Sequence, residues 1–89
     1  MKKITIKKLL ELKKTVGMCW SGLIWFQNRY PEGVYICEKE VNRALAKHEC
    51  FVTWLPYQLD REVYDEFYKD GYGDIKNTMI LVEFFNKIF

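Results

Sequence analysis

Apolar residues recur along this chain at steps of three and four, which is the spacing of one face of an α-helix. The first such stretch follows Thr5, whose hydroxyl can cap a helix, and it stops at Gly17, which tolerates the left-handed conformation common after a helix. The pattern therefore predicts a first helix between these two residues. Ile6, Leu9 and Leu10 are expected on one side of this helix, and lysines on the other.

The next stretch, MCWSGLIWFQNRY at residues 18–30, is apolar on nearly every side when it is placed on a helix. It predicts a second helix, which Pro31 and Gly33 end. Trp25 lies across from the main apolar stripe and is expected to be at least partly exposed. The stripe consists of Cys19, Leu23, Phe26 and Tyr30, widened by Trp20 and Ile24.

Three further helices are predicted downstream. One begins after Cys37, which stands where a capping hydroxyl or acid is usual. Thr53 could cap a short helix that has Pro56 in its first turn, where a missing N–H costs little. Another begins at Asp60 and would end at the Gly71–Gly73 pair. The inner stripe of the first of these three is expected to comprise Val41, Ala44, Leu45 and His48.

The last stretch, residues 74–89, fits two structures. Asp74 as a cap and apolar residues at helical steps favour a helix, but the residue types of TMILVEFF are equally typical of a β-strand. A strand would need a partner, and GVYI at residues 33–36 is the only candidate, so the helix is favoured. We therefore predict an all-α single domain over residues 1–89 with five or six short helices. The alternative is an α+β fold with a C-terminal strand near residues 78–85. The expected core includes Trp20, Leu23, Phe26, Leu45, Leu55 and Phe67.

Composition narrows the class of protein. With 49% apolar residues, the 89-residue chain can bury enough surface to fold, but it has no room for a second core. No stretch approaches the roughly 18 apolar residues of a membrane span, and lysines interrupt the opening segment before a signal peptide could form. The three cysteines have no paired spacing, so reduced, buried thiols in a bacterial host cytoplasm are expected.

The inventory of reactive side chains is small. The only histidine and the only serine are His48 and Ser21, and no nucleophile-elbow motif surrounds the serine. Cys19, Cys37 and Cys50 with the histidine match no common zinc spacing. We therefore expect no catalytic activity, no metal and no cofactor.

Charge is distributed unevenly, and this points to binding. Residues 1–14 hold six lysines and one glutamate, whereas residues 60–74 hold six acids and two bases. In the acidic segment tyrosines alternate with carboxylates, which suits a basic protein surface. The predicted partner-binding residues are Tyr64, Asp65, Glu66, Tyr68, Asp70 and Tyr72. The alternative is nucleic-acid binding through the arginine-free patch of Lys2, Lys3, Lys7 and Lys8.

About residues 5–59 also carry a recognisable pattern: a Leu-rich helix, Gly-x-Cys, an aromatic helix closing on Pro-x-Gly, a third helix and a closing Trp-Leu. This pattern resembles a module of small, mostly uncharacterised phage and prophage proteins. It departs from that module at Tyr30, where Phe is usual, and at Cys37. The matching residues are Leu9, Leu10, Gly17, Cys19, Gly22, Leu23, Trp25, Phe26, Pro31, Gly33, Ala44, Trp54 and Leu55.

The resemblance implies a phage-like genome and an all-helical N-terminal half, and it assigns no site residue. Together with the acidic segment, it leads us to expect a stoichiometric binder of a host protein, such as an inhibitor of a CRISPR–Cas or other bacterial defence system. A nuclease effector with a basic channel is the expected partner, because an acidic aromatic surface can mimic phosphate and stacked base there. No membrane partner is expected.

Overall fold

The computed structural model describes residues 1–68 and 78–89, and this part of the chain is mostly helical, which confirms the all-α prediction. A two-stranded antiparallel sheet accompanies six helices in these ranges. The elements are β1 (Lys3–Ile4), α1 (Ile6–Val16), α2 (Trp20–Arg29), β2 (Val34–Tyr35), α3 (Glu38–Ala46), α4 (Cys50–Leu59), α5 (Arg61–Tyr68) and α6 (Thr78–Ile88). No helix in the described ranges is long and apolar enough to cross a membrane.

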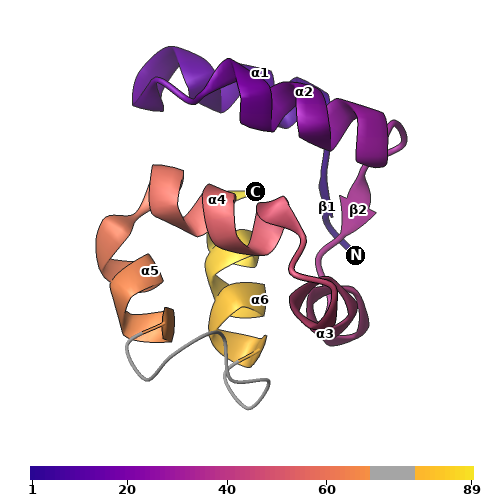
Figure 1. The fold of residues 1–89 in the computed structure, drawn as a ribbon, viewed down its shortest axis with the longest axis vertical. Helices are drawn as coiled ribbons and strands as arrows, with labels where there is room; N and C mark the ends of the chain where they lie inside the picture. The colour runs from indigo at the N-terminus through magenta and orange to yellow at the C-terminus, as the bar shows by residue number, and fades with distance from the viewer. Residues whose placement is uncertain (69–77) are drawn as a thin grey trace.

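The small sheet fixes how the first two helices run. Lys3 pairs with Tyr35, and Ile4 pairs with Val34. Because α1 leaves directly from β1 and α2 returns to β2, the two helices are antiparallel. Together they form one layer at the top of the view, and α3, α4, α5 and α6 lie below it, with β1 and β2 running between the layer and α3 (Figure 1).

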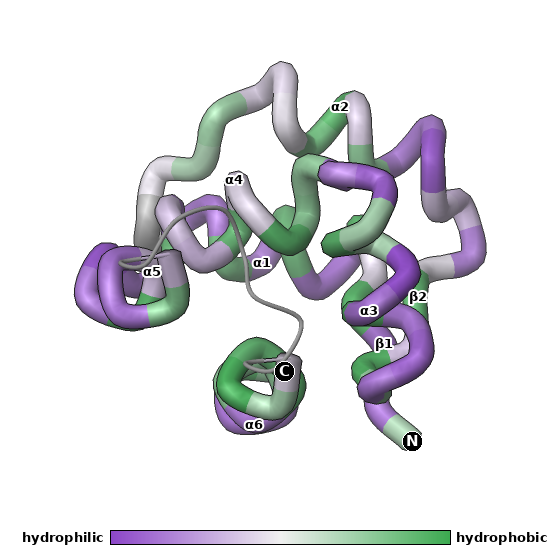
Figure 2. The backbone as a smooth tube through the Cα atoms, turned by 60° about the horizontal axis from the view of Figure 1, so that its bottom comes forward, coloured by the Kyte–Doolittle hydropathy of each residue, from purple (hydrophilic) through white to green (hydrophobic). Residues whose placement is uncertain are grey.

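The core lies where this layer meets the lower helices. The ring of Phe51 in α4 lies 6.4 Å from that of Phe26 in α2 and 6.3 Å from that of Phe85 in α6, centroid to centroid. In Figure 2 the hydrophobic side of α6 turns toward the other helices, and its hydrophilic side faces outward. Five residues of the predicted core are buried, namely Leu23, Phe26, Leu45, Leu55 and Phe67. The sixth prediction, Trp20, is wrong, because its side chain is 60% exposed.

Several predicted helix ends are confirmed. The Thr5 hydroxyl accepts a hydrogen bond from the Lys8 amide, and Gly17 follows α1 with a left-handed φ of 65°. The Asp60 carboxylate accepts from the amides of Glu62 and Val63 at the start of α5. Cys37 stands at the cap position of α3, but its side chain makes no capping hydrogen bond. The predicted ends at Gly71–Gly73 and at Asp74 lie outside the described residues.

The start of α4 differs from the prediction. The helix begins at Cys50, so the Thr53 hydroxyl does not cap it but donates to the Cys50 carbonyl, at 3.2 Å. Pro56 consequently lies in the helix interior, where its missing N–H leaves the Val52 carbonyl without its usual helical donor. The Tyr68 hydroxyl of α5 donates to that carbonyl instead, at 2.7 Å.

Three further expectations need correction. The C-terminal strand alternative is wrong, because residues 78–85 belong to α6. GVYI does contribute a strand, but its partner is the short segment Lys3–Ile4, which no sequence pattern indicated. His48 is not on the inner side of α3, because that helix ends at Ala46 and His48 is exposed with a positive φ of 54°.

A glycine allows α2 and α4 to approach closely. A Cβ at Gly22 would lie 2.3 Å from Cε2 of the Trp54 indole, far inside contact distance. The indole therefore lies directly against the backbone of α2. This contact sets the distance between the two helices that carry the surfaces described next.

Candidate interaction surfaces

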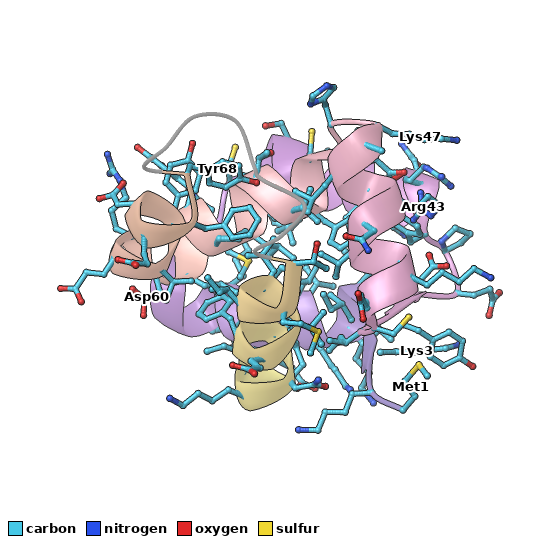
Figure 3. The ribbon with its side chains drawn as sticks, turned by 90° about the horizontal axis from the view of Figure 1, so that it is seen from below. Met1, Lys3, Arg43, Lys47, Asp60 and Tyr68 are labelled. Carbon is cyan, nitrogen blue, oxygen red and sulfur yellow. The ribbon has the colours of Figure 1, made fainter. Side chains whose placement is uncertain are left out.

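The acidic part of the predicted binding segment forms one surface with the end of α4. The Tyr64 ring lies 5.2 Å from the Tyr57 ring and 4.8 Å from the Tyr68 ring, centroid to centroid. The Arg61 guanidinium lies 4.3 Å from the Tyr57 ring centre. Figure 3 shows Asp60 and Tyr68 at opposite ends of α5. We give the name acidic tyrosine face to these rings together with Arg61 and the exposed carboxylates of α5 and its cap; it comprises Tyr57, Asp60, Arg61, Glu62, Tyr64, Asp65, Glu66 and Tyr68.

The predicted binding residues of this face differ in how exposed their side chains are. Asp65 and Glu66 are exposed, whereas Tyr64 and Tyr68 are half-buried. The Tyr68 hydroxyl is already used on the Val52 carbonyl, so this side chain also holds α5 on α4. Asp70 and Tyr72 lie outside the described residues. Tyr57, 43% exposed, belongs to the face but was missed, because it comes from the preceding helix and only tertiary packing brings it to Tyr64.

The N-terminal lysines do not project freely as one patch. The Lys2 ammonium donates to the Asn86 carbonyl at 2.7 Å, and the Lys8 ammonium donates to the Lys3 carbonyl at 3.1 Å. Lys3 donates to the Glu32 carbonyl and also lies over the Tyr35 ring, 4.7 Å from its centre. Lys7 is exposed. A phosphate chain that engaged all four ammonium groups would have to displace three sets of internal contacts.

An apolar strip that sequence reasoning missed runs along the outside of the α1–α2 pair. Leu10 is 40%, Trp20 60% and Ile24 55% exposed. The Lys13 ammonium lies 3.3 Å from the centre of a Trp20 ring, so these two side chains meet across the helices. Leu10 lies one turn before Lys13, and Ile24 one turn after Trp20, so in antiparallel helices both fall at the same level. We call Leu10, Trp20 and Ile24 the apolar strip.

The two tryptophans of α2 differ from the expectation in one respect: Trp20 was expected in the core but is exposed. Trp25 is half-buried, as predicted, and packs against the core, with its ring 6.2 Å from that of Tyr30. Trp20 is the more exposed of the pair. The sequence does not indicate which tryptophan is the more exposed, because α2 is apolar on nearly every side and its periodicity does not show which side meets the core.

A buried polar cluster joins α2, α3 and the start of α4. The carboxylate of Glu49, 8% exposed, accepts from the Tyr30 hydroxyl and from Arg43 Nη1, the latter at 2.5 Å. Arg29 Nη2 reaches the same carboxylate at 3.2 Å, and Arg43 Nη2 also donates to the Tyr30 oxygen at 2.7 Å. Glu40 completes the cluster on Arg43, at 3.1 Å. Figure 3 shows Arg43 on α3.

The electrostatics of this cluster favour one charge state. Burial raises the pKa of Glu49, but hydrogen bonds from Tyr30 and Arg43 outweigh burial, so the net pKa is lowered. Burial and the neighbouring carboxylate raise the pKa of Tyr30. Glu49 is therefore held ionised and Tyr30 protonated. Glu49, Tyr30 and Arg43 direct their hydrogen bonds at other members of the cluster, which is the pattern of a structural cluster.

The cysteines are less buried than expected. Cys19 and Cys50 are exposed, and Cys37 is intermediate. The Cys19 sulfur lies 2.9 Å from the Ser21 hydroxyl, and this hydrogen bond, with those from the backbone at Gly22 and Ser21, lowers the pKa of the thiol. Within residues 1–68 and 78–89, no three His, Cys, Asp or Glu side chains come together as a set that could hold a metal ion.

Comparison with known proteins adds no relative: no protein-family model, curated protein or solved structure matches the chain. The resemblance to the phage module therefore stays a prediction.

Proposed function

We propose that this protein acts stoichiometrically, by binding a protein with a basic surface through the acidic tyrosine face. The observation that carries the proposal is the row of rings formed by Tyr57, Tyr64 and Tyr68, bordered by the carboxylates of α5. Tyrosine is among the residues that dominate binding energy at protein interfaces, because its ring supplies contact area and its hydroxyl supplies hydrogen bonds.

The carboxylates near this row of rings favour a partner with a basic surface. Asp60, Glu62, Asp65 and Glu66 lie within seven residues of chain, and all four are exposed. Arg61, whose Nε lies 3.9 Å from the Asp65 carboxylate, is the one basic residue among residues 60–68, so the segment keeps a negative net charge. Clustered charge of one sign speeds association with a surface of the opposite sign and disfavours partners of the same sign. A channel that normally holds nucleic acid has both basic side chains and groups that stack on bases. An acidic surface with aromatic rings is complementary to both.

The biological role proposed is inhibition of a bacterial defence effector, such as a CRISPR–Cas nuclease, by a phage-encoded protein. Its support is the charge and aromatic content of the face together with the resemblance of residues 5–59 to phage proteins. In this role the protein would block the channel without chemistry of its own. One copy of the protein would then inactivate one effector.

A capture experiment tests the proposal. Tagged protein is mixed with lysate of a bacterial host, and retained proteins are identified and assayed for nuclease activity. The double variant Glu62→Lys, Asp65→Lys should lose the captured protein at least tenfold. The matched control, Glu11→Lys, Glu32→Lys, makes the same change in net charge at exposed sites away from the face and should retain it.

Two outcomes would overturn the proposal. One is capture that both charge variants retain equally, because the face would then be irrelevant. The other is salt-sensitive binding to random DNA that disappears when Lys2, Lys3, Lys7 and Lys8 become glutamine, which would assign the nucleic-acid function instead.

A further inference from the structure

The apolar strip is a second surface, separate from the acidic tyrosine face. α1 packs against α2, α2 packs against α4, and α4 packs against α5. The strip lies on the α1 side of α2, whereas the acidic tyrosine face lies on α4 and α5. Three large apolar side chains are exposed on the adjacent helices α1 and α2, with Trp20 at 60% exposure, and clustered apolar exposure of this kind marks interaction sites.

The charges around the strip indicate what can cover it. Lys13 contacts Trp20, and Lys7 and Lys14 flank Leu10 on α1, at three residues before and four after. α2 contributes no acidic residue, since its sequence is WSGLIWFQNR. The occupant must therefore offer apolar contact for the strip and carboxylates for the lysines.

This chain itself carries such a surface. The acidic tyrosine face presents the exposed ring of Tyr57 and the half-buried ring of Tyr64, with the exposed carboxylates of Asp60, Glu62 and Asp65 on the same helix as Tyr64 or at its cap. Two strips facing each other would instead bring lysines against lysines, which disfavours a symmetric dimer through this surface. Charge complementarity thus selects a contact between the two different faces.

We infer that the protein self-associates head to tail, with the apolar strip of one copy packed against the acidic tyrosine face of another. Trp20 and Ile24 then lie against Tyr57 and Tyr64, and the lysines of α1 lie against the carboxylates of α5. The inference shares a face with the proposed function and adds its regulation: self-association covers the surface that would bind the host protein.

The size of the molecule limits the strength of this contact. The described chain has 5563 Å² of accessible surface, and a standard interface of about 800 Å² per partner would cover about one seventh of it. With a short apolar strip and exposed charges, we expect association that is weak, reversible and sensitive to salt. Monomer should therefore dominate at low micromolar concentration, and larger species should grow as the concentration rises.

Sedimentation of the purified full chain over a concentration series provides the first test. We expect the mean mass to rise with concentration at low salt and to fall when salt is added. Ile24→Ser should weaken the association at least tenfold. The matched control is Ile88→Ser, an exposed isoleucine at 39% exposure on α6, on the other side of α1, and it should leave the association unchanged.

Charge exchange provides the decisive test. A variant with Lys7→Glu, Lys14→Glu and a second with Glu62→Lys, Asp65→Lys should each remain monomeric, because each carries two faces of like charge. Mixed together, they should associate, because each variant supplies the face that the other has lost. Such rescue is specific to a contact between the two faces and excludes misfolding as the cause of either loss.

Other results would overturn the inference. A chain that stays monomeric at every concentration refutes it. Association that Ile24→Ser removes and Glu62→Lys, Asp65→Lys leaves intact would assign a symmetric strip-to-strip dimer. A monomer that pellets with phosphatidylglycerol vesicles would assign the strip to an anionic membrane. None of these measurements uses a host protein, so they can fail while capture of a host protein succeeds, and the reverse.

Discussion

The Tyr68 hydroxyl of α5 donates its hydrogen bond to the Val52 carbonyl of α4, the one carbonyl that Pro56 deprives of a helical partner. A buried carbonyl without a donor destabilises a fold, so a side chain from the next helix satisfies what the proline leaves open. The same bond fixes α5 against α4. Tyr68 therefore belongs to the architecture of the acidic tyrosine face at least as much as to its surface.

This relationship gives a first prediction. Tyr68→Phe should lower the free energy of unfolding by about 1 kcal/mol, because the Val52 carbonyl loses its donor. In a Pro56→Ala background the helix supplies its own N–H, so the same substitution should cost much less. Urea unfolding of the four proteins gives the coupling directly. Equal costs in both backgrounds would show that the carbonyl does not depend on Tyr68.

A second prediction concerns Gly22. Alanine is the better helix former by about 1 kcal/mol, but its Cβ would overlap the Trp54 indole. We expect Gly22→Ala to destabilise the protein by about 1–3 kcal/mol, because overpacking outweighs propensity. Thermal unfolding followed by circular dichroism measures the change. In a Trp54→Leu background the alanine should cost less or stabilise, whereas an undiminished cost would contradict the contact.

The third prediction is a pH dependence. The pKa of Glu49 is lower in the folded protein than its ordinary value of 4.5, so its ion pairs stabilise the fold above that value. This stability is lost as the pH falls below about 4.5 and through the folded pKa. Unfolding free energies measured from pH 7 to pH 3 should therefore decline less steeply in Glu49→Gln. Glu32→Gln, at an exposed position, should decline as the native protein does.

A fourth prediction concerns Cys19. The Ser21 hydrogen bond lowers the pKa of this exposed thiol and so enlarges its thiolate fraction near neutral pH. Iodoacetamide should therefore label Cys19 faster than the exposed Cys50 of the same molecule. Ser21→Ala should slow labelling of Cys19 a few-fold and leave Cys50 unchanged, as mass spectrometry of the labelled peptides would show. If Cys19 reacts equally fast in the variant, the serine has no such role.

Most of the fold is predictable from local signals in the sequence. Thr5, Gly17 and Asp60 act through hydrogen bonds and backbone conformations within a few residues, so their roles are readable from sequence. The start of α4 was predicted wrongly because Pro56 was expected in a first turn. Its place in the helix interior depends on Tyr68, twelve residues later and on another helix, which donates to the carbonyl that the proline leaves without a donor. The strand at Lys3–Ile4 is too short to have a periodicity.

The candidate surfaces were less predictable for a related reason. Asp65 and Glu66 are exposed, as charged residues in a helix usually are. The choice between Trp20 and Trp25 depends on where α1 and α4 pack around α2, which no feature of α2 alone decides. Tyr57 joins Tyr64 only because Asp60 starts a new helix that folds back on α4.

The contact between Lys2 and the Asn86 carbonyl has a topological consequence. It ties the residue before β1 to the last turn of α6, so we expect that a short glycine-rich bridge can join residues 1 and 89. The chain is thus close to a closed loop, and its order of elements need not begin at β1. A circular permutant that joins these residues and opens at the exposed Pro31–Glu32 turn should reach the same native arrangement from a different starting point.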